Sequence, residues 1–129
     1  MPEKQRAKPR VVIADDDNDI RRLVQITVAN AGCDVTAAPD GESALEAVRE
    51  VMPDLVILDV LMPRMDGWEV AKELKRDPKT AGIPIMFLTS KGQEHDVLEG
   101  FEAGGADYVV KPFSPRELQA RVRSALAKR

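Results

Sequence analysis

The chain has 129 residues, 43% hydrophobic and 32% charged, which is the length and composition of one globular domain rather than of a disordered segment. Its 19 basic and 22 acidic side chains give a formal net charge of −3, which argues against direct nucleic-acid binding by this domain. No apolar run is long enough to span a membrane, and the single cysteine excludes an internal disulfide, so we expect a cytoplasmic protein.

The first nine residues differ in composition from the rest of the chain. Residues 1–9 contain Lys4, Arg6 and Lys8 but no hydrophobic segment. We therefore expect a flexible, basic tail over residues 1–9 and a folded domain over residues 10–129.

Five short apolar runs follow the tail. In chain order they are residues 11–14, 35–38, 55–58, 85–88 and 108–110. Three of them are continuously apolar rather than alternating, which is typical of strands that are covered on both faces of a parallel sheet. We predict that each run is a β-strand.

Apolar side chains recur at helical spacing between these runs. The stripes lie within residues 20–31, 45–52, 70–74, 97–101 and 118–126. Ser114-Pro115 and Asp66-Gly67 precede two of the stripes and are typical of helix N-termini. Strand and helix thus alternate five times, which predicts an α/β fold with a doubly wound, five-stranded parallel sheet and helices on both faces.

Polar side chains follow four of the predicted strands. Asp15 and Asp16 come after the first run and Asp59 after the third, while Thr89 and Lys111 come after the fourth and fifth. Ligands of open α/β sheets bind beyond the carboxyl ends of the strands. We therefore expect these five side chains to share one site at that edge.

Three carboxylates in one site would repel one another. Unit charges about 4 Å apart interact by about 1 kcal/mol in water and by about 4 kcal/mol at an effective dielectric near 20. Lys111 offsets only one of the charges on Asp15, Asp16 and Asp59. Oxygen ligands favour a hard cation, so the sequence predicts bound Mg²⁺, or Mn²⁺, rather than zinc.

The same residues suggest phosphoryl transfer. An aspartate carboxylate can attack phosphorus and form an aspartyl phosphate. Such transfer depends mainly on positioning and on neutralising the charge of the phosphoryl oxygens. Mg²⁺, Lys111 and the Thr89 hydroxyl could provide both around Asp59.

Four stretches of the sequence resemble one family. They are residues 11–17 (VVIADDD), 54–67 (DLVILDVLMPRMDG), 87–90 (FLTS) and 108–113 (YVVKPF). Together they resemble the receiver domains of two-component response regulators, over about residues 10–127. The resemblance implies a flavodoxin-like, CheY-like (βα)5 fold with strand order 2-1-3-4-5.

The resemblance also implies a role for each site residue. Asp59 would accept a phosphoryl group from a histidine kinase or a histidine phosphotransfer protein, in a reaction that requires Mg²⁺. The metal would be held by Asp16, Asp59 and the backbone carbonyl of Leu61, with Asp15 acting mainly through water. Lys111 would contact a phosphoryl oxygen.

The implied switch consists of Thr89 and Tyr108. Thr89 would hydrogen-bond the phosphoryl group, Tyr108 would rotate toward the space that Thr89 vacates, and the face formed by the fourth helix, fifth strand and fifth helix would carry the signal. That signal would reach an output domain or a target protein, from a monomer or a phosphorylation-dependent dimer. The Lys111-Pro112 peptide bond is expected to be cis.

Three other functions remain open from the sequence. A degenerate receiver would act as an interaction module without phosphorylation, although the intact acids and Lys111 argue against this. Asp15-x-Asp17 formally fits a phosphatase with an aspartate nucleophile, whereas the receiver reading predicts no turnover of a separate substrate. A flavin-binding protein would need a glycine- and hydroxyl-rich phosphate loop, which the acidic turn after the first strand does not provide.

Overall fold

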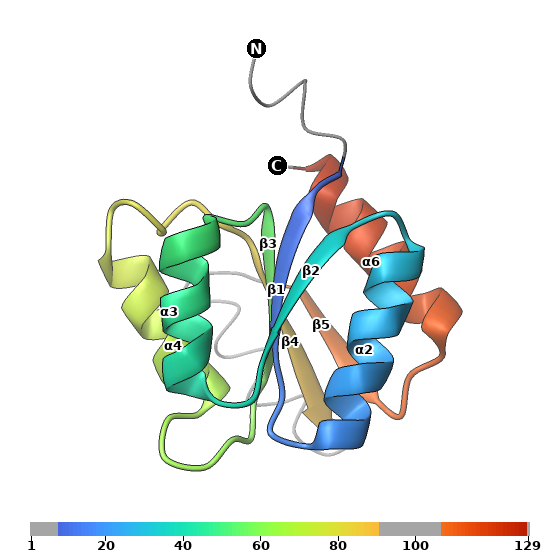
Figure 1. Ribbon diagram of the computed structural model, residues 1–129, viewed down its shortest axis with the longest axis horizontal. Coiled ribbons are helices and arrows are strands. Elements are labelled where there is room, and N and C mark those ends of the chain that lie inside the picture. The colour runs from blue at the N-terminus through green and yellow to red at the C-terminus, as the bar shows by residue number, and fades with distance from the viewer. Residues whose placement is uncertain (1–7, 91–106, 129) are drawn as a thin grey trace.

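Five parallel strands form one sheet in the order β2-β1-β3-β4-β5 in a computed structural model, which describes residues 8–90 and 107–128 (Figure 1). The strands are β1 (Arg10–Ala14), β2 (Asp34–Ala38), β3 (Leu55–Asp59), β4 (Ile85–Ser90) and β5 (Asp107–Lys111). The helices are α2 (Asn18–Asn30), α3 (Gly41–Val51), α4 (Gly67–Arg76) and α6 (Pro115–Ala127). The predicted doubly wound architecture and its strand order are confirmed.

Two predictions fall outside the described residues. The helical stripe at residues 97–101 is one, and the tail predicted for residues 1–9 is the other, apart from its last two residues. Within the described residues, none of the helices has the length and apolar character needed to cross a membrane.

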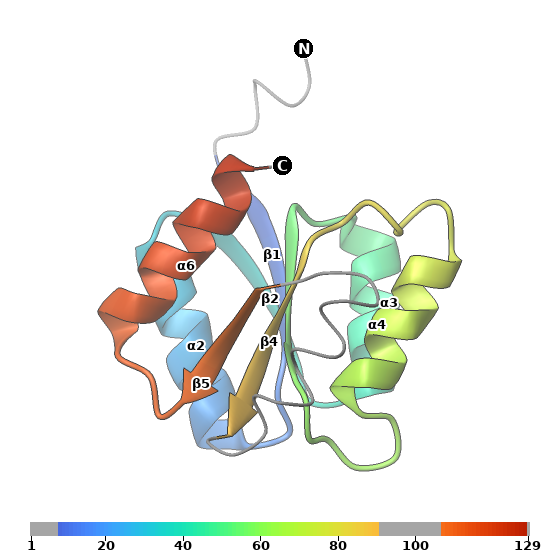
Figure 2. The same cartoon turned by 180° about the vertical axis from the view of Figure 1, so that it is seen from behind.

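The central strands are buried on both faces. Nearly every residue of β1, β3 and β4 is inaccessible to solvent, whereas the edge strands β2 and β5 are partly exposed. Helices α3 and α4 cover one face of the sheet, and α2 and α6 cover the other, as the two opposite views show (Figures 1 and 2). The continuous apolar runs in the sequence are therefore the strands that lie between two helical layers.

Successive strand residues point into two separate cores. On β1, Val12 packs with the α3 and α4 side of the sheet, and Val11 packs with the α2 and α6 side. Leu58 and Ile57 alternate in the same way on β3. Cys33 is buried in the second core, as expected of a small hydrophobic side chain.

Side-chain caps begin the described helices. The Asp17 carboxylate accepts hydrogen bonds from the backbone N–H groups of Asp19 and Ile20 and so caps α2. Asp66 forms a reciprocal capping box with Glu69 at the start of α4. These caps fix where each helix leaves the carboxyl edge of the sheet, which is where the acidic residues lie.

Candidate functional site

The carboxyl ends of the strands meet at one edge of the sheet, toward which the arrowheads of β4 and β5 point (Figure 2). β1 and β3 are neighbours, and Ala14 lies opposite Leu58 in their register. The next positions along these strands are Asp15 and Asp59, which therefore lie side by side. The sheet thus brings together acids that are 44 positions apart in the chain.

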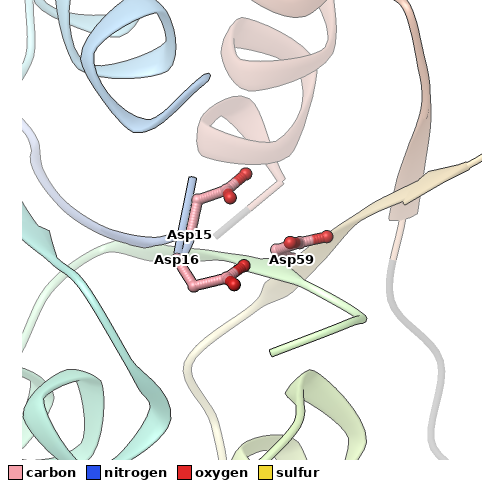
Figure 3. Close-up of side chains that lie close together, drawn as sticks. All are labelled: Asp15, Asp16 and Asp59. Atoms are coloured by element: carbon pink, nitrogen blue, oxygen red, sulfur yellow. The ribbon is translucent and has the colours of Figure 1, made fainter. Parts of the chain in front are cut away.

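Three carboxylates converge at this edge. One oxygen from each of Asp15, Asp16 and Asp59 lies within 4.8 Å of the others, and Figure 3 shows the three side chains around a common space. Asp15 and Asp59 are buried, with 1% and 7% of their surface exposed, while Asp16 is exposed. Oxygen donors at this spacing fit a hard divalent cation such as Mg²⁺, so the cluster could bind a metal ion.

Lys111 reaches the same cluster from β5. Its Nζ atom lies 3.0 Å from an Asp15 oxygen and 3.2 Å from an Asp59 oxygen. Burial by itself lowers the pKa of Lys111, but the hydrogen bond and charge of Asp15, together with Asp59, outweigh it and raise the pKa above its usual value. The lysine is therefore charged at neutral pH, yet it supplies one positive charge to a cluster of three acids.

The pKa of Asp59 is raised by its position in this cluster. Burial and the charge of Asp15 raise the pKa of Asp59 to about 6, against the lowering effects of Lys111 and of a hydrogen bond from the Leu61 backbone. An added cation would favour the ionised carboxylate, which is the form that can attack phosphorus. The charge state of Asp59 therefore depends on what binds here.

Asp15 is held at every polar group. Its N–H donates to the Ala38 carbonyl at 3.3 Å, and its carboxylate accepts from the Asp17 N–H at 3.0 Å and from Lys111. Arg21 donates to its backbone carbonyl at 2.9 Å. The turn after β1 therefore has a fixed shape before any ligand binds.

Two glycines lie against the loop after Asp59: Gly67, which the sequence indicated only as part of a helix start, and Gly41, which was not singled out in the sequence. A Cβ at Gly67 would collide with the backbone carbonyl oxygen of Asp59, and the Gly67 N–H donates to the Val60 carbonyl at 3.0 Å. A Cβ at Gly41 would lie 2.6 Å from the Met65 carbonyl oxygen. Both positions require glycine for close approach.

The predicted switch residues lie on the neighbouring strands β4 and β5, with Thr89 at the carboxyl edge and Tyr108 near the start of β5, opposite Phe87 in the register. Thr89 is buried at the end of β4, and Tyr108 is half-buried on β5 and packs against the core on the α3 and α4 side. The Lys111-Pro112 bond is cis, as predicted. The movements expected of Thr89 and Tyr108, and metal binding by the Leu61 carbonyl, stay predictions.

Trp68 follows Asp59 by nine positions in the sequence. It stands in the first turn of α4, half-buried, with its ring centroid 4.6 Å from that of Phe87. The adjacent residue Gly67 touches the Asp59 backbone. Trp68 is therefore placed to report on the site by fluorescence.

Known proteins share this sequence and fold. Residues 11–123 match the model of the response regulator receiver domain. The chain is 44% identical to the DNA-binding dual master transcriptional regulator RpaA of Synechocystis over 92% of its length, and 44% identical to the DNA-binding response regulator MtrA of Mycolicibacterium smegmatis, also over 92%. It spans about half the length of these curated relatives, 49% and 51% respectively.

Solved structures agree with the fold. The chemotaxis protein CheY4 of Vibrio cholerae superposes with a TM-score of 0.85 at 33% identity, over 92% of this chain and 99% of that one. The receiver domain of Francisella response regulator 1452 gives a TM-score of 0.84 at 31% identity, over 94% and 98%. The chain, with paired acids after β1, an acid at the end of β3 and a lysine at the end of β5, therefore belongs to the response-regulator receiver family.

Proposed function

We propose that Asp59 accepts a phosphoryl group from a histidine kinase or a histidine phosphotransfer protein in an Mg²⁺-dependent reaction. The observation that carries this proposal is the convergence at one sheet edge of three carboxylates whose oxygens lie within 4.8 Å of one another, with Lys111 within 3.2 Å of two of them. Each acid has a distinct environment there. Asp59 is buried against Lys111, and Asp16 faces solvent from the turn after β1.

In the proposed step, an Asp59 oxygen bonds to phosphorus as the phosphorus–nitrogen bond of the donor's phosphohistidine breaks. The histidine ring leaves with the electron pair and takes up a proton from solvent. Asp16, Asp59 and the Leu61 carbonyl would hold Mg²⁺, with Asp15 acting mainly through water, and the ion would supply positive charge to the phosphoryl oxygens. Lys111 would contact another phosphoryl oxygen, because its ammonium group already lies against Asp59.

The proposed output follows from the same residues. Thr89 would donate its hydroxyl to the phosphoryl group, and Tyr108 would follow it inward, changing the surface of β5 and α6. An output domain or a separate target protein would read that surface, since the curated relatives are transcriptional regulators about twice as long as this chain. We place this signalling in the cytoplasm and expect a monomer or a phosphorylation-dependent dimer.

We expect no turnover of a separate substrate. In the Asp15-x-Asp17 pattern that resembles an aspartate phosphatase, the Asp17 carboxylate is engaged by two N–H groups of α2. Asp15 is buried against Lys111. The Asp15 carboxylate is not open to a substrate and Asp17 serves as a helix cap, so Asp59 is the proposed acceptor.

Mass spectrometry of the intact protein tests the proposal. We expect acetyl phosphate and Mg²⁺ to add the mass of one phosphoryl group to the wild type, to add none without Mg²⁺, and to add none to Asp59→Asn. Asp34→Asn is the matched control, because Asp34 is exposed at the opposite end of the sheet. Unchanged labelling of Asp59→Asn would assign the phosphoryl group elsewhere and contradict the proposal.

A further inference from the structure

We propose that Arg21 is a positioning residue for the metal-binding turn, an inference that rests on the proposed function. Its guanidinium group donates to the Asp15 backbone carbonyl at 2.9 Å and to Asn18 Oδ1 at 2.6 Å. Arg21 is half-buried on α2, and its own N–H donates to the Asp17 carbonyl at 2.9 Å. One side chain therefore ties the turn after β1 to the first turn of the helix.

The hydrogen bond from Arg21 to the Asp15 carbonyl contributes to the position of Asp16. Asp16 lies between two peptide groups that are both held: the Asp15 carbonyl is bound by Arg21, and the Asp17 N–H is bound by the Asp15 carboxylate. The Asp16 carboxylate is exposed and has no hydrogen-bond partner among the residues that the structure describes. Its position relative to Asp59 is therefore set through the backbone, and Arg21 holds one of the two peptide groups.

The positive charge of Arg21 does not stabilise helix α2. A positive side chain in the first turn of a helix opposes the helix dipole. A guanidinium group also provides two donors in a rigid fork, which matches two acceptors in a way that an ammonium group does not. Arg22, the next residue, carries the same charge but is exposed and bonds to nothing in the described part of the chain.

This neighbour separates a positioning effect from a charge effect, because the two have opposite signs. Removing a positive charge near the acids lowers the repulsion that Mg²⁺ meets, so charge alone makes the ion bind more tightly. Loss of the bond to the Asp15 carbonyl loosens the turn and makes the ion bind more weakly. Groups that orient metal ligands in this way typically change metal affinity by about 10-fold to 100-fold.

Calorimetric titration of the full chain with MgCl₂ tests the inference. We expect Arg21→Gln to raise the Mg²⁺ dissociation constant about tenfold. The control Arg22→Gln should lower it by up to about twofold through charge alone. Arg21→Lys, which keeps the charge and a donor group but not the planar fork, should recover part of the loss.

Asn18→Ala provides a second test without a charge change. It removes the acceptor that orients the guanidinium group, and we expect it to raise the Mg²⁺ dissociation constant about threefold. Circular dichroism establishes whether each variant is folded. If Arg21→Gln does not fold, the Mg²⁺ affinity of Asn18→Ala decides the question. The inference is overturned if Arg21→Gln binds Mg²⁺ as tightly as Arg22→Gln does, or if Asn18→Ala binds as the wild type does. A wild type that takes up no Mg²⁺ would instead overturn the proposed function, and the inference with it.

Discussion

The two ends of strands β1 and β3 differ in how their polar groups are paired. At the amino end, the Arg10 N–H donates to the Asp54 carboxylate and the Asp54 N–H donates to the Arg10 carbonyl, both at 2.8 Å. The Arg10 guanidinium group also donates to the Val51 carbonyl at 3.3 Å. At the carboxyl end, Asp15 and Asp59 share one lysine.

The difference shows which end is built for a ligand. Protein groups alone satisfy the amino end, so its stability should depend little on solution conditions. The carboxyl end gathers like charges in a buried setting, which raises the pKa of Asp59 to about 6. Its stability should therefore respond to pH and to divalent cations, and four substitutions probe this contrast.

Gly67→Ala should have the largest effect. The added Cβ would collide with the Asp59 carbonyl oxygen and lie 3.0 Å from the Val60 Cα atom, and neither backbone atom can yield easily. We expect the free energy of unfolding to fall by about 3 kcal/mol in urea denaturation. Gly82→Ala, whose Cβ meets nothing within 4 Å, is the control. Equal effects of the two substitutions would show that the loop at Asp59 is not tightly packed.

Lys111→Gln should come second. It leaves two buried carboxylates without their shared cation, so we expect a loss of about 2 kcal/mol of unfolding free energy in EDTA. Mg²⁺ should restore part of this loss, because it replaces the missing charge. Lys72→Gln removes an exposed lysine of α4 and should change stability little in either condition. If Mg²⁺ leaves the loss of stability unchanged, Lys111 does not stabilise the protein by neutralising the charge of the acids.

Asp59→Asn should stabilise the protein without metal. The pKa of Asp59 in the folded state, about 6, lies above the ordinary pKa of 3.8 for an aspartate. The folded state therefore binds more protons between these pH values and loses stability as pH rises through them. We expect a gain of about 1.5 kcal/mol at neutral pH in EDTA, which disappears below about pH 4. Asp34→Asn is the control. A pH-independent gain would assign the effect to packing instead.

Asp54→Ala should have the smallest effect of the four. It removes the acceptor of the Arg10 N–H at the amino end, which costs about 1 kcal/mol. Because the cluster of three acids found among the described residues lies at the other end of the sheet, the loss should be the same in EDTA and in Mg²⁺. If thermal unfolding shows that the stability lost in Asp54→Ala depends on Mg²⁺, the proposed difference between the two ends of the sheet is contradicted.

The sequence predicted the fold well because burial is encoded directly in it. The runs at residues 11–14, 55–58 and 85–88 are continuously apolar since both faces of β1, β3 and β4 are covered. The helical stripes located the helices but not their first residues. α3 begins at Gly41, before the stripe at residues 45–52, because Asp40 caps it by accepting the Ser43 N–H.

The acids of the site were predictable for a topological reason. Asp15, Asp16 and Asp59 follow parallel strands, and parallel strands end at one edge. The bond from Arg21 to a backbone carbonyl and the contact of Gly67 with Asp59 were not found, because neither follows a periodic pattern. A glycine next to the capping Asp66 was the available signal, since glycine is a poor helix former. The roles of Thr89 and Tyr108 depend on motion, which neither composition nor spacing encodes.

The most direct test compares the unfolding free energy of the wild type in EDTA and in saturating MgCl₂ as pH is varied. In EDTA, we expect stability to fall as pH rises from about 4 to about 7, as Asp59 ionises beside Asp15. In MgCl₂ that fall should vanish or reverse, because the ion binds the ionised cluster of the folded state only. Two superimposable curves would contradict the claim that this sheet edge is completed by a divalent cation.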